Sequence, residues 1–119
     1  MILKWATDWW RRRSPRRARI GRVRRFASRA EVPRDGSRRQ VALVQSGEIQ
    51  KWALFWCPCG RGHRIELNLD SSHSPHWRLH LDGRGRPSIS PSVDVRDAWG
   101  CHFWLTDGRV RWCPWYRTL

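Results

Sequence analysis

Acidic residues are scarce in this chain: ten Asp and Glu stand against 24 Lys and Arg, and the formal net charge is +14. Long apolar runs are also missing. No stretch approaches the roughly 20 apolar residues of a membrane span, and Lys4 interrupts the apolar start, so we expect neither a transmembrane segment nor a secretory signal peptide. These absences predict a cytoplasmic protein, in which paired cysteines bind metal more often than they form disulfides.

The positive charge is concentrated at the start of the chain. Residues 1–40 carry 14 Lys and Arg but three acids, a net charge of +11, whereas residues 41–119 carry a net charge of +3. The densest stretch, Arg11–Arg29, would suit contact with nucleic acid or with an anionic membrane. We therefore expect a basic, disordered or part-helical arm over residues 1–35, followed by a β domain over residues 36–119.

Helical patterns are absent after residue 40, and short alternating segments take their place. Two clear turn signals, Asp82-Gly83 and Asp107-Gly108, separate some of these segments. Predicted strands cover residues 41–45, 49–56, 63–69, 77–81, 86–95, 101–106 and 109–113. The sequence thus predicts a small all-β domain, antiparallel and zinc-ribbon-like, built from β-hairpins.

Four cysteines occur in two clusters. Cys57 and Cys59 form a Cys-x-Cys knuckle, and Cys101 and Cys113 flank the predicted hairpin with its turn at 107–108. This hairpin pairs residues whose numbers sum to about 215, so Cys113 lies within one residue of the position opposite Cys101. The spacing predicts a four-sulfur site that holds a structural Zn²⁺.

Other arrangements of the cysteines stay open. His63 or His102 could replace one thiol as a ligand, and the cysteines could instead be small buried hydrophobes in a tryptophan-rich core. A closed four-ligand site has no open position at which to activate water. Any catalysis would then come from residues beside the metal.

A series of short motifs runs through the predicted domain in the order WALFWCPCG, HRIELNL, a lone Trp77, SPSV, CHFWL and DGRVRW. With these motifs the chain resembles a family of small bacterial and phage domains, over roughly residues 32–113. Some members, called BubE, accompany bacterial ubiquitin-like conjugation operons. The resemblance implies a peptidase that trims or removes a ubiquitin-like protein.

The resemblance also implies roles for individual residues. Ser92 in SPSV matches the proposed nucleophile and His102 the proposed general base, while Cys57, Cys59 and Cys101 match the family's cysteines. Many members read CPCGCG, and this chain has Arg61 at the third of those cysteine positions, so Cys113 or His63 must complete the site. Adjacent side chains on a strand point to opposite faces, so Cys101 could face the metal while His102 faces a cleft.

A Ser/His pair needs further groups to act as a peptidase. Serine is a weak nucleophile until a base takes its proton, a third group normally orients the imidazole, and donors must stabilise the oxyanion. The candidates are Asp94, Asp97 and Asp107 as the orienting group, and Arg84, Arg86 or backbone amides near Ser92 as oxyanion donors.

The leading hypothesis is a metal-stapled Ser/His peptidase that acts on the C-terminal tail or the conjugates of a ubiquitin-like protein. Such a tail could add as a strand at the edge near residues 86–95. The alternative is a non-catalytic zinc-ribbon module that binds nucleic acid through the Arg11–Arg29 arm and exposed tryptophans. A third hypothesis is a structural or adaptor protein that the arm tethers to a polyanion.

Overall fold

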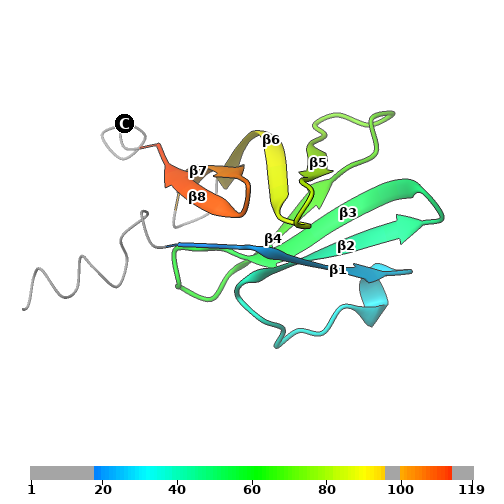
Figure 1. Ribbon diagram of the computed structural model, residues 1–119, viewed down its shortest axis with the longest axis horizontal. Helices are drawn as coiled ribbons and strands as arrows, with labels where there is room; N and C mark the ends of the chain where they lie inside the picture. Colours follow the sequence, from blue (N-terminus) through cyan, green and yellow to red (C-terminus); the bar gives the residue numbers. More distant parts are fainter. Residues whose placement is uncertain (1–17, 96–99, 114–119) are drawn as a thin grey trace, which may run out of the picture.

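Short strands dominate the computed structural model of this protein, which describes residues 18–95 and 100–113 (Figure 1). Along the described chain the elements are β1 (Arg22–Phe26), the 3-10 helix η2 (Arg29–Glu31), β2 (Gln40–Ser46), β3 (Ile49–Trp56), β4 (Arg64–Asn68), β5 (Arg78–Leu81), β6 (Pro87–Val95), β7 (Cys101–Thr106) and β8 (Arg109–Trp112). The all-β prediction is confirmed. No helix in the described part of the chain is long and apolar enough to cross a membrane.

The strands form two four-stranded sheets. The first sheet has the order β1-β2-β3-β4 and the second the order β5-β6-β7-β8. The described pairs are antiparallel, as the hairpin patterns predict, apart from β1, which lies parallel to β2 with Val23 opposite Val41. A parallel neighbour requires a crossover connection, and residues 27–39 supply it.

One hydrophobic core joins the two sheets. Phe55 of β3 meets Phe103 of β7 edge to face, with ring centroids 6.4 Å apart and ring planes at 79°. The same cluster contains Val41, Leu43, Ala53, Ile65 and Leu67 from the first sheet, and Leu79, Ile89, Val93, Cys101, Leu105 and Val110 from the second. The inward face of β7 is therefore the one that carries its odd-numbered residues, and its even-numbered residues lie on the outer face of the second sheet.

The segment before β1 ties the two sheets together. The amide of Ile20 donates to the Gly108 carbonyl at 2.8 Å, and the amide of Val110 donates to the Ala18 carbonyl at 3.1 Å, so this segment lies along β8 before the chain enters the first sheet. The Ile20 side chain is 1% exposed within the core. At Gly108 a Cβ atom would lie 3.0 Å from the Gly21 Cα, and φ is +75°, so the turn and the close approach both require glycine.

The described part of the predicted arm is thus built into the fold. Residues 18–26 add a core side chain and an edge strand, although their composition is dominated by arginine. An edge strand needs few apolar residues, and here Val23 and Phe26 alternate with exposed arginines. Residues 1–17, which hold the rest of the predicted arm, lie outside the described residues.

Replacing Ile20 by alanine tests whether this segment carries part of the core. Because the side chain is fully buried, we expect Ile20→Ala to lower the free energy of unfolding by about 2–5 kcal/mol, measured by urea denaturation. The exposed neighbour Arg22 provides the control, since Arg22→Ala should change it by less than about 0.5 kcal/mol. Equal effects of the two substitutions would contradict the packing described here.

Candidate functional site

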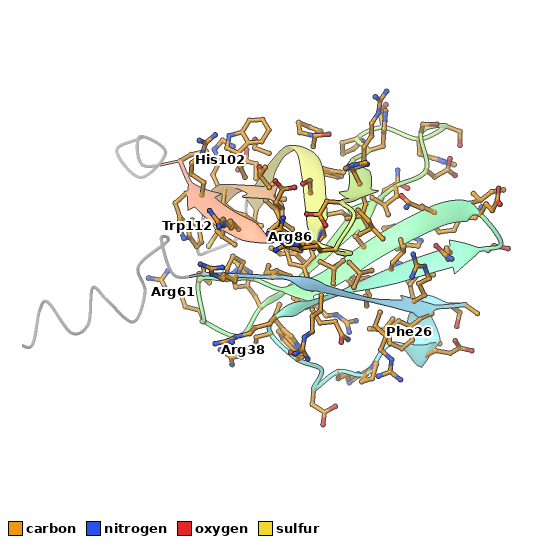
Figure 2. All side chains as sticks on the ribbon, viewed as in Figure 1. Phe26, Arg38, Arg61, Arg86, His102 and Trp112 are labelled. Carbon is orange, nitrogen blue, oxygen red and sulfur yellow. The ribbon has the colours of Figure 1, made fainter. Side chains whose placement is uncertain are left out.

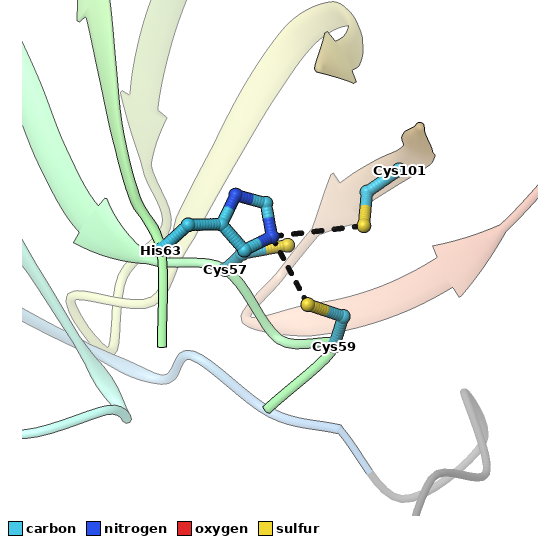
Figure 3. Close-up of side chains that lie close together, drawn as sticks. All are labelled: Cys57, Cys59, His63 and Cys101. Carbon is cyan, nitrogen blue, oxygen red and sulfur yellow. Dashed lines mark hydrogen bonds between the residues drawn. The ribbon is translucent and has the colours of Figure 1, made fainter. Parts of the chain in front are cut away.

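The loop between β3 and β4 is closed by hydrogen bonds between its own backbone groups. The amide of Cys57 donates to the His63 carbonyl at 2.9 Å, which closes the loop, and the amide of Gly60 donates to the Cys57 carbonyl at 3.3 Å. Gly60 has a φ of +79°, a conformation that favours glycine. The amide of Arg61 then lies 3.5 Å from the Cys59 sulfur. This tight turn directs Cys57, Cys59 and His63 toward one another (Figure 3).

Cys101, the first residue of β7, brings the fourth donor from the other sheet. The Nε2 atom of His63 lies 3.0 Å from the Cys59 sulfur and 3.8 Å from the Cys101 sulfur (Figure 3). The donor atoms of all four residues, Cys57 included, lie within 4.8 Å of one another. A tetrahedral centre with bonds of about 2.0–2.3 Å separates its donors by about 3.3–3.8 Å, so the spacing fits a single metal ion.

The electrostatics of the cluster favour a cation. A hydrogen bond with Cys101 and burial raise the pKa of the Cys57 thiol, and burial also raises the pKa of Cys59. The hydrogen bond from Cys57 lowers the pKa of Cys101 to about 6, since it stabilises that thiolate. Three thiols this close cannot all ionise without a compensating positive charge. The Cys3His group could therefore hold a metal ion, because bound metal favours the thiolate form.

Cys113, the fourth sulfur of the predicted site, is not among these four residues, and His63 stands in its place. In the β7–β8 ladder Phe103 faces Trp112, so position 113 shares a face with His102 and not with Cys101. An offset of one residue therefore moves the Cys113 side chain to the other face of the sheet. The predicted register, in which paired numbers sum to about 215, is confirmed; in it Cys113 lies opposite His102, and this decides which face the thiol occupies.

Ser92 and His102 lie on the outer face of the second sheet. The Ser92 hydroxyl oxygen is 2.8 Å from Nε2 of His102, and both side chains are half-buried. Figure 2 shows His102 on the side of this sheet that faces away from the first sheet. The structure thus brings together the two side chains that the SPSV and CHFWL motifs single out.

A bulge in β6 aims Ser92 at the histidine. Ile89 pairs with Leu105 and Val93 with Phe103, so three residues of β6, 90–92, lie opposite the single residue Trp104. Such bulges re-aim side chains and are common beside active sites. The indole N–H of Trp77 donates to the Ser92 carbonyl at 3.2 Å and fixes the bulge. The two prolines near Ser92 signal an irregular strand, but the sequence does not reveal the offset.

The acidic candidates separate clearly in space. Asp94 of β6 is the direct partner of His102 across the β6–β7 ladder. Asp107 lies at the other end of β7, where its amide donates to the Ser88 hydroxyl at 2.8 Å. Asp97 lies outside the described residues. Among the described aspartates, Asp94 is therefore the one that the strand register places beside the imidazole.

The two arginines considered as oxyanion donors belong to the β5–β6 turn. Arg86 Nε donates to Asp82 at 2.7 Å, and the Arg84 amide donates to the same carboxylate at 2.9 Å. Ser92 lies near the opposite end of β6. Backbone amides near Ser92 therefore remain as oxyanion candidates, whereas the arginines line a different part of the surface.

The comparisons with known proteins fit this geometry. The family described as "Bacterial ubiquitination-like system serine protease (BubE)" matches residues 28–113. The chain belongs to this family. Searches of curated proteins and of solved structures find no match.

Metal analysis of the purified protein tests the ligand set. We expect one metal ion per chain, retained in Cys113→Ala but lost in Cys101→Ala, because only the second substitution removes a member of the cluster. Loss of the ion should lower the Tm by about 10 °C or more. Acidification should release it, since the thiolates must take up protons. Retention of metal by Cys101→Ala, measured by mass spectrometry of the elements, would refute this assignment.

Proposed function

We propose that this protein is a serine peptidase that cleaves the C-terminal tail or the conjugates of a ubiquitin-like protein, with Ser92 as nucleophile and His102 as general base. The observation that carries the proposal is the 2.8 Å contact between the Ser92 hydroxyl and His102 Nε2 in a member of the BubE family. The family is described as a serine protease of a bacterial ubiquitination-like system, which supports both the chemistry and the partner.

The 2.8 Å contact supports proton transfer between Ser92 and His102. His102 Nε2 accepts the Ser92 proton as the oxygen attacks the substrate carbonyl, and the same nitrogen then donates that proton to the leaving amine. In the second half, His102 takes a proton from water as the water oxygen attacks the acyl carbon of the resulting ester. The bond to Ser92 then breaks, the acid product leaves, and His102 returns the proton to the Ser92 oxygen. Trp77 holds the Ser92 carbonyl from the opposite side, so the nucleophile needs little reorganisation before attack.

Asp94 is proposed as the positioning residue for the imidazole. Directly paired residues of an antiparallel ladder have Cβ atoms about 4.5–5.5 Å apart, so the carboxylate lies beside the His102 ring. Oδ1 of Asp94 and Nδ1 of His102 are both buried. A negative charge at this distance stabilises the imidazolium that forms during attack.

The metal is proposed to be Zn²⁺, bound by Cys57, Cys59, His63 and Cys101. Soft thiolates with one imidazole in a closed tetrahedral set are typical of structural zinc. A closed set supplies rigidity to the fold and no reaction chemistry. Because Cys101 is adjacent to His102, the ion fixes the backbone from which the base projects.

The alternative function in nucleic-acid binding has less support from the described residues. Two aromatic rings at the basic edge already have arginines stacked on them: the Arg29 guanidinium lies 4.2 Å from the Trp52 ring centroid, and that of Arg24 lies 4.9 Å from the Phe26 centroid. Both arginines would have to leave the ring faces before a nucleic-acid base could stack on these rings. The charge of the chain alone does not select nucleic acid over another polyanion.

Substitution of the proposed nucleophile is the direct test. With a bacterial ubiquitin-like protein extended at its C-terminus as substrate, we expect Ser92→Ala to lower kcat by about 10³-fold or more, because the substitution removes the hydroxyl that lies 2.8 Å from Nε2. The matched control is Ser90→Ala, which changes an exposed serine in the same bulge and should leave the rate within about threefold. Metal content and Tm should be unchanged in both variants. Parent-like cleavage by Ser92→Ala would exclude this nucleophile.

A conservative change at Asp94 tests the positioning role. We expect Asp94→Asn to lower kcat by about 10²–10⁴-fold with little change in KM, because the imidazolium loses its nearby negative charge. A variant that merely misfolds would lose Tm and metal content together with activity. Loss of activity through misfolding alone, or a rise in KM at unchanged kcat, would contradict the proposed role.

A further inference from the structure

A basic depression lies at the far end of the β7–β8 hairpin from the Ser92–His102 pair. Its volume is about 430 Å³, and its lining comprises Arg86, Thr106, Asp107, Arg109 and Arg111. Three of these five side chains carry a positive charge. The depression is separate from the metal cluster, and the proposed reaction gives it no role.

The charges of the depression are unevenly compensated. Arg86 is neutralised by Asp82, at 2.7 Å between Nε and Oδ2. The described ion pairs include neither Arg109 nor Arg111, although both side chains are exposed. Asp107, the one acid of the lining, receives a 3.4 Å contact from the Ser88 hydroxyl. Two guanidinium groups are thus available to an outside carboxylate.

The same arginines share a sheet face with the proposed catalytic pair. Arg111 lies opposite Trp104 and Arg109 opposite Thr106, and these two residues of β7 alternate with the core positions just as His102 does. A strand rises about 3.3 Å per residue. Measured along the strand direction, Arg111 is therefore about 7 Å from His102, and Arg109 is about 13 Å from it. Trp104, with 37% of its surface exposed, lies directly opposite Arg111, between His102 and Thr106 along β7.

We propose that this face recognises an acidic segment of the substrate. The inference rests on the proposed function. An extended chain spans about 3.3–3.6 Å per residue, so carboxylates two to four residues from the cleaved bond would reach Arg111 and Arg109. Guanidinium groups bind carboxylates through paired, charge-assisted hydrogen bonds, which suits this selection. Trp104 would pack against the intervening side chain.

Binding to a catalytically blocked protein tests the inference without cleavage. The probes are two fluorescein-labelled extended peptides that differ only in having Glu or Gln at three successive positions. We expect full-length, metal-loaded Ser92→Ala protein to bind the Glu peptide at least about 10-fold more tightly by fluorescence anisotropy. Adding Arg111→Glu should abolish this preference, and raising the salt from about 50 to about 300 mM should weaken it.

Arg78 supplies a matched control. It is an exposed arginine on β5, the opposite edge strand of the same sheet, so Arg78→Glu changes the net charge equally and should keep the preference. Arg111→Gln, which removes the charge without reversing it, should also reduce the preference for the Glu peptide. This variant guards against a loss of preference caused by misfolding of Arg111→Glu. Equal affinity for the two peptides overturns the inference. So does a single-stranded oligonucleotide of equal length that binds through Arg111 more tightly than the Glu peptide.

Cleavage separates this inference from the proposed function. If the parent protein cleaves the tailed ubiquitin-like substrate in a Ser92-dependent way, replacing acidic residues near the cleaved bond should lower kcat/KM by about 10-fold or more, and Arg111→Glu should remove that difference. Ser92-dependent cleavage with the same kcat/KM whether or not those acidic residues are present refutes the acidic subsite alone. Absence of cleavage refutes the proposed function, while Arg111-dependent binding of the Glu peptide would still establish the acidic-segment site.

Discussion

The position of Cys101 is the constraint on which the rest of the site depends. Three of the four donors come from one short loop, and Cys101 joins them from 38 residues beyond His63, the last of the three. A metal ion held by these four residues would link distant segments and remove considerable freedom from the unfolded chain. It would also fix the first residue of β7 against the other sheet. In a domain this small, such a link would substitute for the buried area that a larger protein has.

Strand alternation connects the position of Cys101 to that of His102, the proposed base. Cys101 points inward to the donors and Phe103 into the core, so His102 between them has one available direction, outward toward Ser92. The bulge opposite Trp104 then supplies what alternation alone cannot, a serine displaced toward Nε2. The inner face of β7 thereby packs in the core, and its outer face carries the proposed base.

The sequence predicted those features that depend on local pattern. It was less informative about which face of a strand a given side chain occupies. The all-β fold and the turn at 107–108 follow from alternation and from Asp-Gly. The choice between Cys113 and His63 depends on the face that position 113 occupies: the register was predicted correctly, but Cys113 lies opposite His102, one residue short of the position opposite Cys101, and so projects from the outer face. Segment 18–26 is Arg-rich because most of it faces solvent, and the buried Ile20 that places it in the core is one residue among many charges. The Ser92–His102 contact joins two strands through a bulge, which the residue pattern does not predict. It was therefore the family resemblance that indicated the pair.

The overall charge of the chain gives a further reason to examine the outer face of the second sheet. A net charge of +14 attracts every polyanion and therefore selects none. Selection requires positive charges held at fixed distances from the reacting groups. Arg109 and Arg111 meet that requirement, because the same hairpin that carries them pairs with the strand of His102. The position of Cys101 thus determines both where the proposed base lies and how far from it the proposed carboxylate site lies.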